Sequence, residues 1–270
     1  MSVNSVAPEV FAEKYGLDLE ETKKAFENLI SGKVTLFSFS GRIASGKDTS
    51  SALFQESLGI QAKREYFAYP LKEEMSDIYE FLLTRKTEAF TDVVSEMKKE
   101  YRTTQDHAEK FAGLLWPSVI KGEDVSFWQR SPLVRMSHQV WGTECRREED
   151  PYYWVKYTAR RIVWNLSHGY STFVTDSRFE NEEDSLQELG SFSVRLKVSR
   201  ETQIERLEKR GDEVNLDSLD HSSEHGLDEY EDDNKFSIVV SADSISAQEV
   251  VNFVMPNYLS HRKELTGSAE

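Results

Sequence analysis

A glycine-rich stretch near residue 40 carries residue types that bind nucleotide phosphates. Residues 37–50 read FSFSGRIASGKDTS, in which Gly41 and Gly46 enclose four residues and precede Lys47. Such a loop binds phosphates when it follows a buried strand and begins a helix, because the backbone N–H groups at the helix start face the anion. The apolar run before the loop favours a buried strand, and the run after the loop favours a helix. We therefore expect nucleotide phosphates to be bound here, through the following residues: Gly41, Ala44, Ser45, Gly46, Lys47, Asp48 and Thr49.

The residue after the lysine indicates a metal ion. Loops of this kind usually continue with Ser or Thr, whereas this chain has Asp48 and then Thr49. Magnesium accepts both carboxylate and hydroxyl oxygens, and a carboxylate beside a triphosphate is repelled unless a cation lies between them. We expect Asp48 or Thr49 to contact Mg²⁺ directly or through water. The choice between the two is open, and Asp48 could instead be a carboxylate favoured by the helix dipole.

Arginines are concentrated in one segment of an acidic chain. The formal net charge is -15, yet residues 130–178 hold eight Lys and Arg against five Asp and Glu. This distribution argues against general nucleic-acid binding and favours a small anionic ligand. The candidates for binding a phosphorylated acceptor are Arg135, Arg146, Arg147 and Arg178, each of which could alternatively form a surface ion pair. Asp176 ends an apolar strand and could support the metal or the acceptor.

Two further groups of residues have alternative interpretations. Arg200, Arg206, Lys209 and Arg210 lead into an acidic loop and could form a lid over the phosphates, or else a solvated helix face with Glu–Arg pairs. His221 and His225 have the spacing of metal ligands on a helix. No third His or Cys lies nearby and Gly226 follows, so polar residues at a helix start explain them better than zinc does.

Strands alternate with helices along the chain, which predicts an α/β fold with a parallel sheet covered on both faces. We expect strands at 34–40, 64–69, 171–179, 191–199 and 236–241. Helices are expected within 8–30, 48–59, 71–83, 133–141, 151–168, 180–190, 200–211 and 247–256, with polar loops at 142–150 and 212–233. The single Cys145 cannot form an internal disulfide, and the chain has no long apolar run and no secretory signal, so we expect a cytosolic protein that binds no membrane.

The order of these motifs resembles that of the deoxynucleoside monophosphate kinases of tailed bacteriophages. The matching residues are Phe39–Gly41 with Ser45–Thr49, Phe67–Lys72, Trp141–Glu144 with Arg146 and Arg147, Tyr153–Val155, Thr175–Phe179 with Asn181 and Glu182, and His221 with Ser223 and Glu224. They fall in the family's order over about residues 34–255. Departures occur at Ser177, at Glu180 and at 241–244, where the family usually has an Asn-Asp-Gly type turn, so the contacts to adenine stay open.

The resemblance implies a three-layer P-loop kinase sandwich with a helical insertion on the substrate side and a lid. The expected regions are an N-terminal helical extension at 1–32, a kinase domain at 33–256 with an insertion at 84–130 and a lid at 200–226, and a flexible tail at 257–270. The resemblance implies acceptor contacts from Lys72, Arg146 or Arg147, Asp176 and Arg178, and a lid formed by the arginines of 200–210. We expect catalytic roles for Lys47, Arg146, Arg147 and Arg178, further substrate contacts from Arg135 and Trp141, and ATP contacts from Arg206 and Arg210. Residues 1–30 and much of 84–130 lie outside the match and are candidates for subunit contacts in a homodimer or for contacts with a partner.

The sequence thus predicts a kinase that transfers the γ-phosphate of ATP to a deoxynucleoside monophosphate, with Mg²⁺ and in the cytosol, that of the host if the chain is viral. Two alternatives stay open. One is a kinase for another small phosphorylated metabolite, such as dephospho-coenzyme A or phosphomevalonate. The other is a protein that senses ATP without transferring phosphate.

Overall fold

The computed structural model describes residues 6–129, 131–211, 219, 222–232 and 235–267. The chain divides into two compact units, one formed by 1–67 with 158–270 and the other by 68–157. The first unit is an α/β unit and the second is helical. The helical unit therefore extends well beyond the insertion expected at 84–130.

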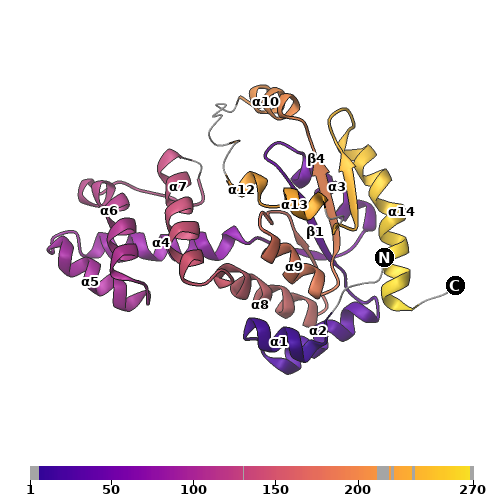
Figure 1. Cartoon of the computed structure of the whole chain (residues 1–270), viewed down its shortest axis with the longest axis horizontal. Helices are drawn as coiled ribbons and strands as arrows, with labels where there is room; N and C mark the ends of the chain where they lie inside the picture. The colour runs from indigo at the N-terminus through magenta and orange to yellow at the C-terminus, as the bar shows by residue number, and fades with distance from the viewer. Residues whose placement is uncertain (1–5, 130, 212–218, 220–221, 233–234, 268–270) are drawn as a thin grey trace. The chain divides into compact units, whose positions relative to one another are not determined.

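The α/β unit is built on a five-stranded parallel sheet, as the alternation of strands and helices predicted (Figure 1). Its strands lie in the order β2 (Ala62–Glu65), β3 (Ser171–Val174), β1 (Leu36–Gly41), β4 (Phe192–Lys197) and β5 (Ile238–Ser241). The chain leaves β1 toward β2 and leaves β4 toward β5, so the connections diverge between β1 and β4. The carboxyl ends of strands at such a point are where open α/β sheets bind ligands.

The two faces of β1 differ in chemistry. Phe37 and Phe39 alternate with Ser38 and Ser40, and all four are fully buried. The aromatic face packs on α3 (Lys47–Leu58) and α14 (Ala247–Thr266), whereas α9 (Glu180–Glu188) covers the serine face (Figure 1). Burial of each phenylalanine contributes roughly 1.5–3 kcal/mol. The sheet that carries the glycine-rich loop is thus anchored from both sides.

The serine face encloses a carboxylate. Glu183 on α9 has no exposed surface and accepts hydrogen bonds from Ser38 Oγ, at 2.5 Å, and from Ser177 Oγ. Burial raises the pKa of Glu183, while the two serines and nearby Arg195 act in the opposite direction. A neutral carboxyl group on this face is the outcome that burial favours.

The remaining elements of the α/β unit follow the expected order. They are α1 (Pro8–Tyr15), α2 (Leu19–Ile30), the last ten residues of α8 (Tyr153–Ser167), α10 (Arg200–Lys209), α12 (Ser222–His225) and α13 (Asp228–Asp232). The predicted loop at 212–233 therefore contains two short helices. The flexible tail expected from 257 is wrong for 257–266, because α14 continues through Pro256 and buries Tyr258 against Phe37 and Phe192.

The helical unit has its own core. It contains α4 (Ala68–Thr84), α5 (Phe90–Glu100), α6 (Gln105–Lys121), α7 (Pro132–Ser137), the π-helix η1 (His138–Arg147) and the first residues of α8. The polar loop expected at 142–150 is wrong for 142–147, which complete η1 with Cys145 and Arg146 buried. The strand expected at 64–69 ends at Glu65, and α4 already begins at Ala68.

No helix in the described ranges combines the length and the apolar character needed to cross a membrane.

Candidate functional site

The glycine-rich loop connects β1 directly to α3, as its sequence predicted. Gly46 precedes the helix with φ of 88°, and Ala44 also has a positive φ, of 60°. Gly41 is required for a different reason: a Cβ there would lie 2.5 Å from Ser45 Oγ and 2.8 Å from the carbonyl oxygen of Leu196. The loop is therefore closely packed against β4, and its shape depends on both glycines.

The backbone of this loop presents N–H groups to the carboxyl edge of the sheet. The N–H of Ser45 is bonded to the carbonyl of Arg42, at 3.1 Å, and that of Ile43 to a carboxylate, at 2.6 Å. Among the residues that the structure describes, none accepts a hydrogen bond from the N–H of Ala44 or Gly46. These groups and the start of α3, which is twelve residues long, form an anion-binding arrangement.

Lys47 is half-buried in the first turn of α3. Burial lowers its pKa, and the nearby guanidinium of Arg178 adds to this effect. The carboxylates of Asp48, Glu224 and Asp176 act in the opposite direction. Lys47 and Arg178 thus place two cationic groups within electrostatic reach of each other beside the loop, which a bound polyphosphate would stabilise.

The two candidate magnesium ligands are accessible. Asp48 and Thr49 are both exposed on the first turn of α3, and Ser51 Oγ donates to the Asp48 carbonyl at 3.0 Å. Within the described part of the chain, no group of three or more His, Cys, Asp or Glu side chains could hold a metal. A nucleotide-bound magnesium ion takes only one or two protein ligands, with phosphates and waters completing the octahedron. The exposed oxygens of Asp48 and Thr49 fit that requirement.

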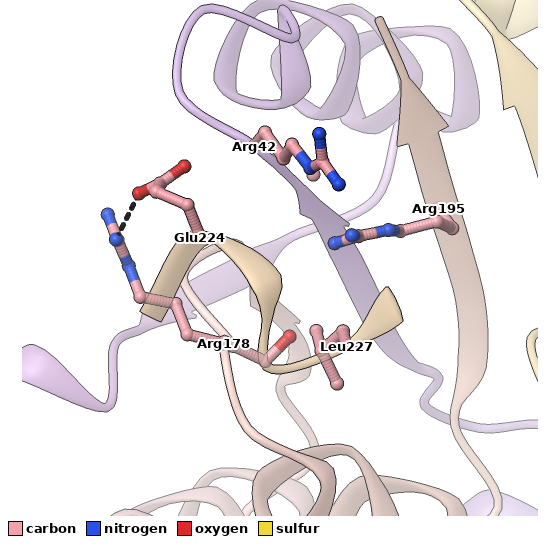
Figure 2. A pocket seen from close by; sticks show the side chains of 7 residues that line it. Arg42, Arg178, Arg195, Glu224 and Leu227 are labelled. Carbon is pink, nitrogen blue, oxygen red and sulfur yellow. Dashed lines mark hydrogen bonds and ion pairs between the residues drawn. The ribbon is translucent and has the colours of Figure 1, made fainter. Parts of the chain in front are cut away.

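The loop after β3 carries Asp176 and Arg178. Asp176 Oδ1 accepts a hydrogen bond from the backbone N–H of Phe67 at 2.8 Å, which fixes the loop beside the end of β2. Arg178 Nη1 forms an ion pair with Glu224, as Figure 2 shows. Both side chains lie at the same sheet edge as the glycine-rich loop; their roles at a site stay predictions.

Charged residues that the sequence did not single out complete this edge. Arg42 in the phosphate loop and Arg195 on β4 extend toward each other in Figure 2. Asp228 pairs with both, at 2.6 Å from Arg42 Nη2 and 3.3 Å from Arg195 Nη2. A cavity of about 290 Å³ adjoins them, lined by Arg42, Arg195, Leu196, Lys197, Val198, Asp228 and Glu231. Arginines and carboxylates therefore alternate around the end of β4.

Arg206 contacts the glycine-rich loop through the loop's carbonyl oxygens. Its guanidinium donates to the carbonyl oxygens of Ala44, at 3.1 Å, and Ser45, at 3.2 Å. It also donates to those of Ala242 and Asp243. In this arrangement Arg206 supports the loop, whereas the sequence suggested a lid contact. Arg210 is exposed at the end of α10, and His221 lies outside the described residues.

Two residues predicted for the site are buried within the helical unit. Trp141 has no exposed surface and stacks on Phe111 at 4.7 Å, so we assign it to the core and correct its predicted substrate contact. Arg146 is 3% exposed; its guanidinium donates to Glu74, to Glu149 and to the Tyr101 carbonyl. Burial raises the pKa of Glu74, and Arg146 opposes that shift. The described contacts of Arg146 are thus those of a buried ion pair.

The other candidates of the helical unit are more accessible. Lys72 is half-buried, with its ammonium group 5.4 Å from the centre of the Trp128 ring. Arg147 is half-buried and donates to the Pro151 carbonyl at 3.4 Å, while Arg135 is exposed on α7. Their roles toward an acceptor stay predictions. Burial raises the pKa of Cys145 to about 12, in keeping with a cysteine that takes no part in chemistry.

Sequence reasoning missed Arg42, Arg195, Asp228 and Glu231. One signal was available: Leu227 and Tyr230 are three residues apart inside a polar stretch, with Asp228 and Glu231 at the same spacing beside them. That pattern indicates a short amphipathic helix and not a solvated loop.

Comparison of the chain with protein-family models and with curated proteins finds no match.

Proposed function

We propose that the chain is a P-loop kinase that transfers the γ-phosphate of ATP to a small phosphorylated acceptor, a deoxynucleoside 5'-monophosphate. The observation that carries the proposal is the glycine-rich loop. It joins the central strand of a parallel sheet to a helix, at the edge where connections diverge, with Lys47 and Arg178 beside it.

The donor would be held by the loop backbone and by Lys47. The N–H groups of Ala44 and Gly46, together with the helix start, would receive the outer phosphates, and Lys47 would add a point charge. Asp48 or Thr49 would hold Mg²⁺, which when bound neutralises charge on the phosphate oxygens. Arg206 would keep the loop in its binding shape through the carbonyls of Ala44 and Ser45.

The chemistry requires no strong general base. A phosphate monoester acceptor is already ionised at neutral pH, so catalysis consists of positioning and charge neutralisation. Arg178 is suited to drawing two anionic groups together, because its planar guanidinium binds phosphate oxygens in pairs. The choice of a deoxynucleotide as acceptor rests on the order of the sequence motifs, including Phe67–Lys72 and Thr175–Phe179.

The function is tested by measuring ADP release in a coupled assay. The acceptors to be added are deoxynucleoside and ribonucleoside monophosphates, dephospho-coenzyme A and phosphomevalonate. We expect release to depend on a deoxynucleoside monophosphate. Turnover only with one of the last two compounds would identify another small-molecule kinase, and ATP binding without acceptor-dependent release would identify a nucleotide sensor.

Lys47→Ala should lower turnover on the order of 10²-fold or more, because electrostatic stabilisation of the transferring group is lost. Lys24, exposed on α2, offers a matched control, since Lys24→Ala removes the same charge away from the loop. Near-normal turnover in Lys47→Ala would refute the kinase proposal.

A further inference from the structure

A short acidic segment, residues 224–231 on α12 and α13, meets the basic residues of the phosphate-loop edge. Its three paired carboxylates are those of Glu224, Asp228 and Glu231. Their ion pairs are Glu224 with Arg178, Asp228 with Arg42 and with Arg195, and Glu231 with Arg195 and with Lys197. The basic partners come from the phosphate loop, from β4 and from the loop after β3, so one segment joins three parts of the edge.

Glu224 differs from the other two carboxylates because it also bonds to the loop backbone. One of its oxygens accepts from Arg178, and the other accepts from the N–H of Ile43 at 2.6 Å. Glu224 is only 7% exposed. A carboxylate buried to this degree is costly unless it is paired and hydrogen-bonded, and these two partners meet that need. The geometry of Arg178 is thereby coupled to that of the loop.

The acidic segment is fixed by packing as well as by charge. A Cβ on Gly226 would lie 2.5 Å from the carbonyl oxygen of Arg178, so only glycine allows this approach. Leu227, Tyr230 and Phe236 form a buried apolar cluster beside it. The backbone segment that carries Glu224 is therefore held by contacts other than the Glu224 ion pair, and such support is a condition for a side chain to orient its partner.

We propose that Glu224 is a positioning residue that holds Arg178 and the start of the phosphate loop in one arrangement for phosphoryl transfer. The inference rests on the proposed kinase function. The Arg178 side chain is 43% exposed, so a guanidinium held by Glu224 retains surface toward the site. The Glu224 carboxylate bonds to the N–H of Ile43, near the strand end of the loop. The helix dipole favours phosphate at the other end of the loop, where α3 begins at Lys47, so the carboxylate and a phosphate would lie at different ends.

The test compares Glu224→Gln with Glu229→Gln in the full chain. Glu229 is exposed on α13 and serves as the control for loss of a charge from the same segment. Glu224→Gln should lower kcat on the order of tenfold or more, because small misplacements of positioning groups have effects of this size. KM for ATP should change much less than kcat. A kcat equal to that of Glu229→Gln, or a lower KM for ATP with kcat retained, would overturn the proposal; the latter would indicate a carboxylate that competes with phosphate.

A double-mutant cycle with Arg178→Met identifies the residue through which Glu224 acts. If it acts through Arg178, adding Glu224→Gln to Arg178→Met should reduce kcat far less than it does in the wild-type chain. Additive losses would overturn this route.

Gly226→Ala gives a second test, which changes no charge. The added methyl group should displace the acidic segment and with it Glu224, so kcat should fall as it does in Glu224→Gln. An unchanged kcat would count against the proposal.

The wild-type chain separates the two hypotheses. If it releases no acceptor-dependent ADP with any acceptor, the kinase function fails and the positioning role fails with it. If the wild-type chain turns over and both Glu224→Gln and Gly226→Ala match Glu229→Gln, only the positioning role fails.

Discussion

Replacing Arg206 with methionine should destabilise the phosphate loop. Methionine retains an apolar stem of similar length but donates no hydrogen bond. The guanidinium of Arg206 donates to the carbonyl oxygens of Ala44 and Ser45 in the loop and to that of Ala242 after β5. The loop carries a strained residue, Ala44, with φ of 60°, whose conformation is maintained only if its surroundings fix it.

The magnitude follows from these bonds. A hydrogen bond from a charged donor contributes about 1.5–3 kcal/mol. Arg206 is only half-buried and its bonds share one side chain, so we expect a total loss of about 2–3 kcal/mol in the free energy of unfolding of the α/β unit, near the value of a single strong bond. If about half of this energy maintains the binding shape of the loop, ATP affinity should fall roughly tenfold, since 1.4 kcal/mol corresponds to that factor.

Urea unfolding measures the free energy of unfolding, and calorimetric titration with ATP measures the affinity for ATP. The matched control is Lys209→Met, which removes an exposed charge from the same helix. An unfolding midpoint and an ATP affinity equal to those of Lys209→Met would refute the structural role. Unchanged stability combined with a large loss of turnover would instead favour the lid role that the sequence suggested.

Two further predictions concern the metal and the buried carboxyl group. Asp48→Asn should raise the Mg²⁺ concentration needed for half-maximal turnover, and an unchanged titration would indicate that Asp48 only stabilises the helix start, with Thr49→Ala as the companion variant. For Glu183, burial raises the pKa in the folded chain, so the native state keeps a proton that the unfolded chain releases above its ordinary pKa of about 4.3. The free energy of unfolding should therefore fall as the pH rises from the ordinary pKa of Glu183 toward its raised pKa in the folded chain. Glu183→Gln should be more stable than the wild-type chain near pH 7 and lose that advantage toward pH 4, as urea unfolding at several pH values would measure; an advantage independent of pH would contradict the argument.

The sheet and the glycine-rich loop between β1 and α3 could be predicted from the sequence because their signals are local. The Phe37–Ser40 alternation, the two glycines and the following helical run lie within about twenty residues, and no distant contact is needed to interpret them. The same holds for Asp176 and Arg178, which follow an apolar strand directly. The order of strands in the sheet is not a local property and became known only from the structure.

The errors occurred where distant contacts outweigh local preference. Pro256 normally ends a helix, at a cost of about 3 kcal/mol in its interior, yet α14 continues because Tyr258 packs on Phe37 and Phe192. The stretch 142–147 looks like a charged loop, but the Arg146 ion pair with Glu74 and the burial of Cys145 fix it as part of a π-helix. The residues that contact Tyr258 and Arg146 lie far away in the sequence, so these contacts could not be identified from the local pattern.

The acidic segment 224–231 contributes to the net charge of -15, and its carboxylates compensate the arginines at the edge of the sheet. An edge that holds Arg42, Arg178 and Arg195 together would repel itself without compensating carboxylates, and α12 and α13 supply them through Glu224, Asp228 and Glu231. Under the proposed function, a phosphorylated ligand that entered this edge would meet arginines that are already paired, and its binding would either share their donors or displace a carboxylate. Because a guanidinium has five N–H donors, Arg178 can share while Glu224 stays in place. Sharing would preserve the geometry between turnovers, and the KM for ATP of Glu224→Gln distinguishes it from displacement, in which that KM would fall.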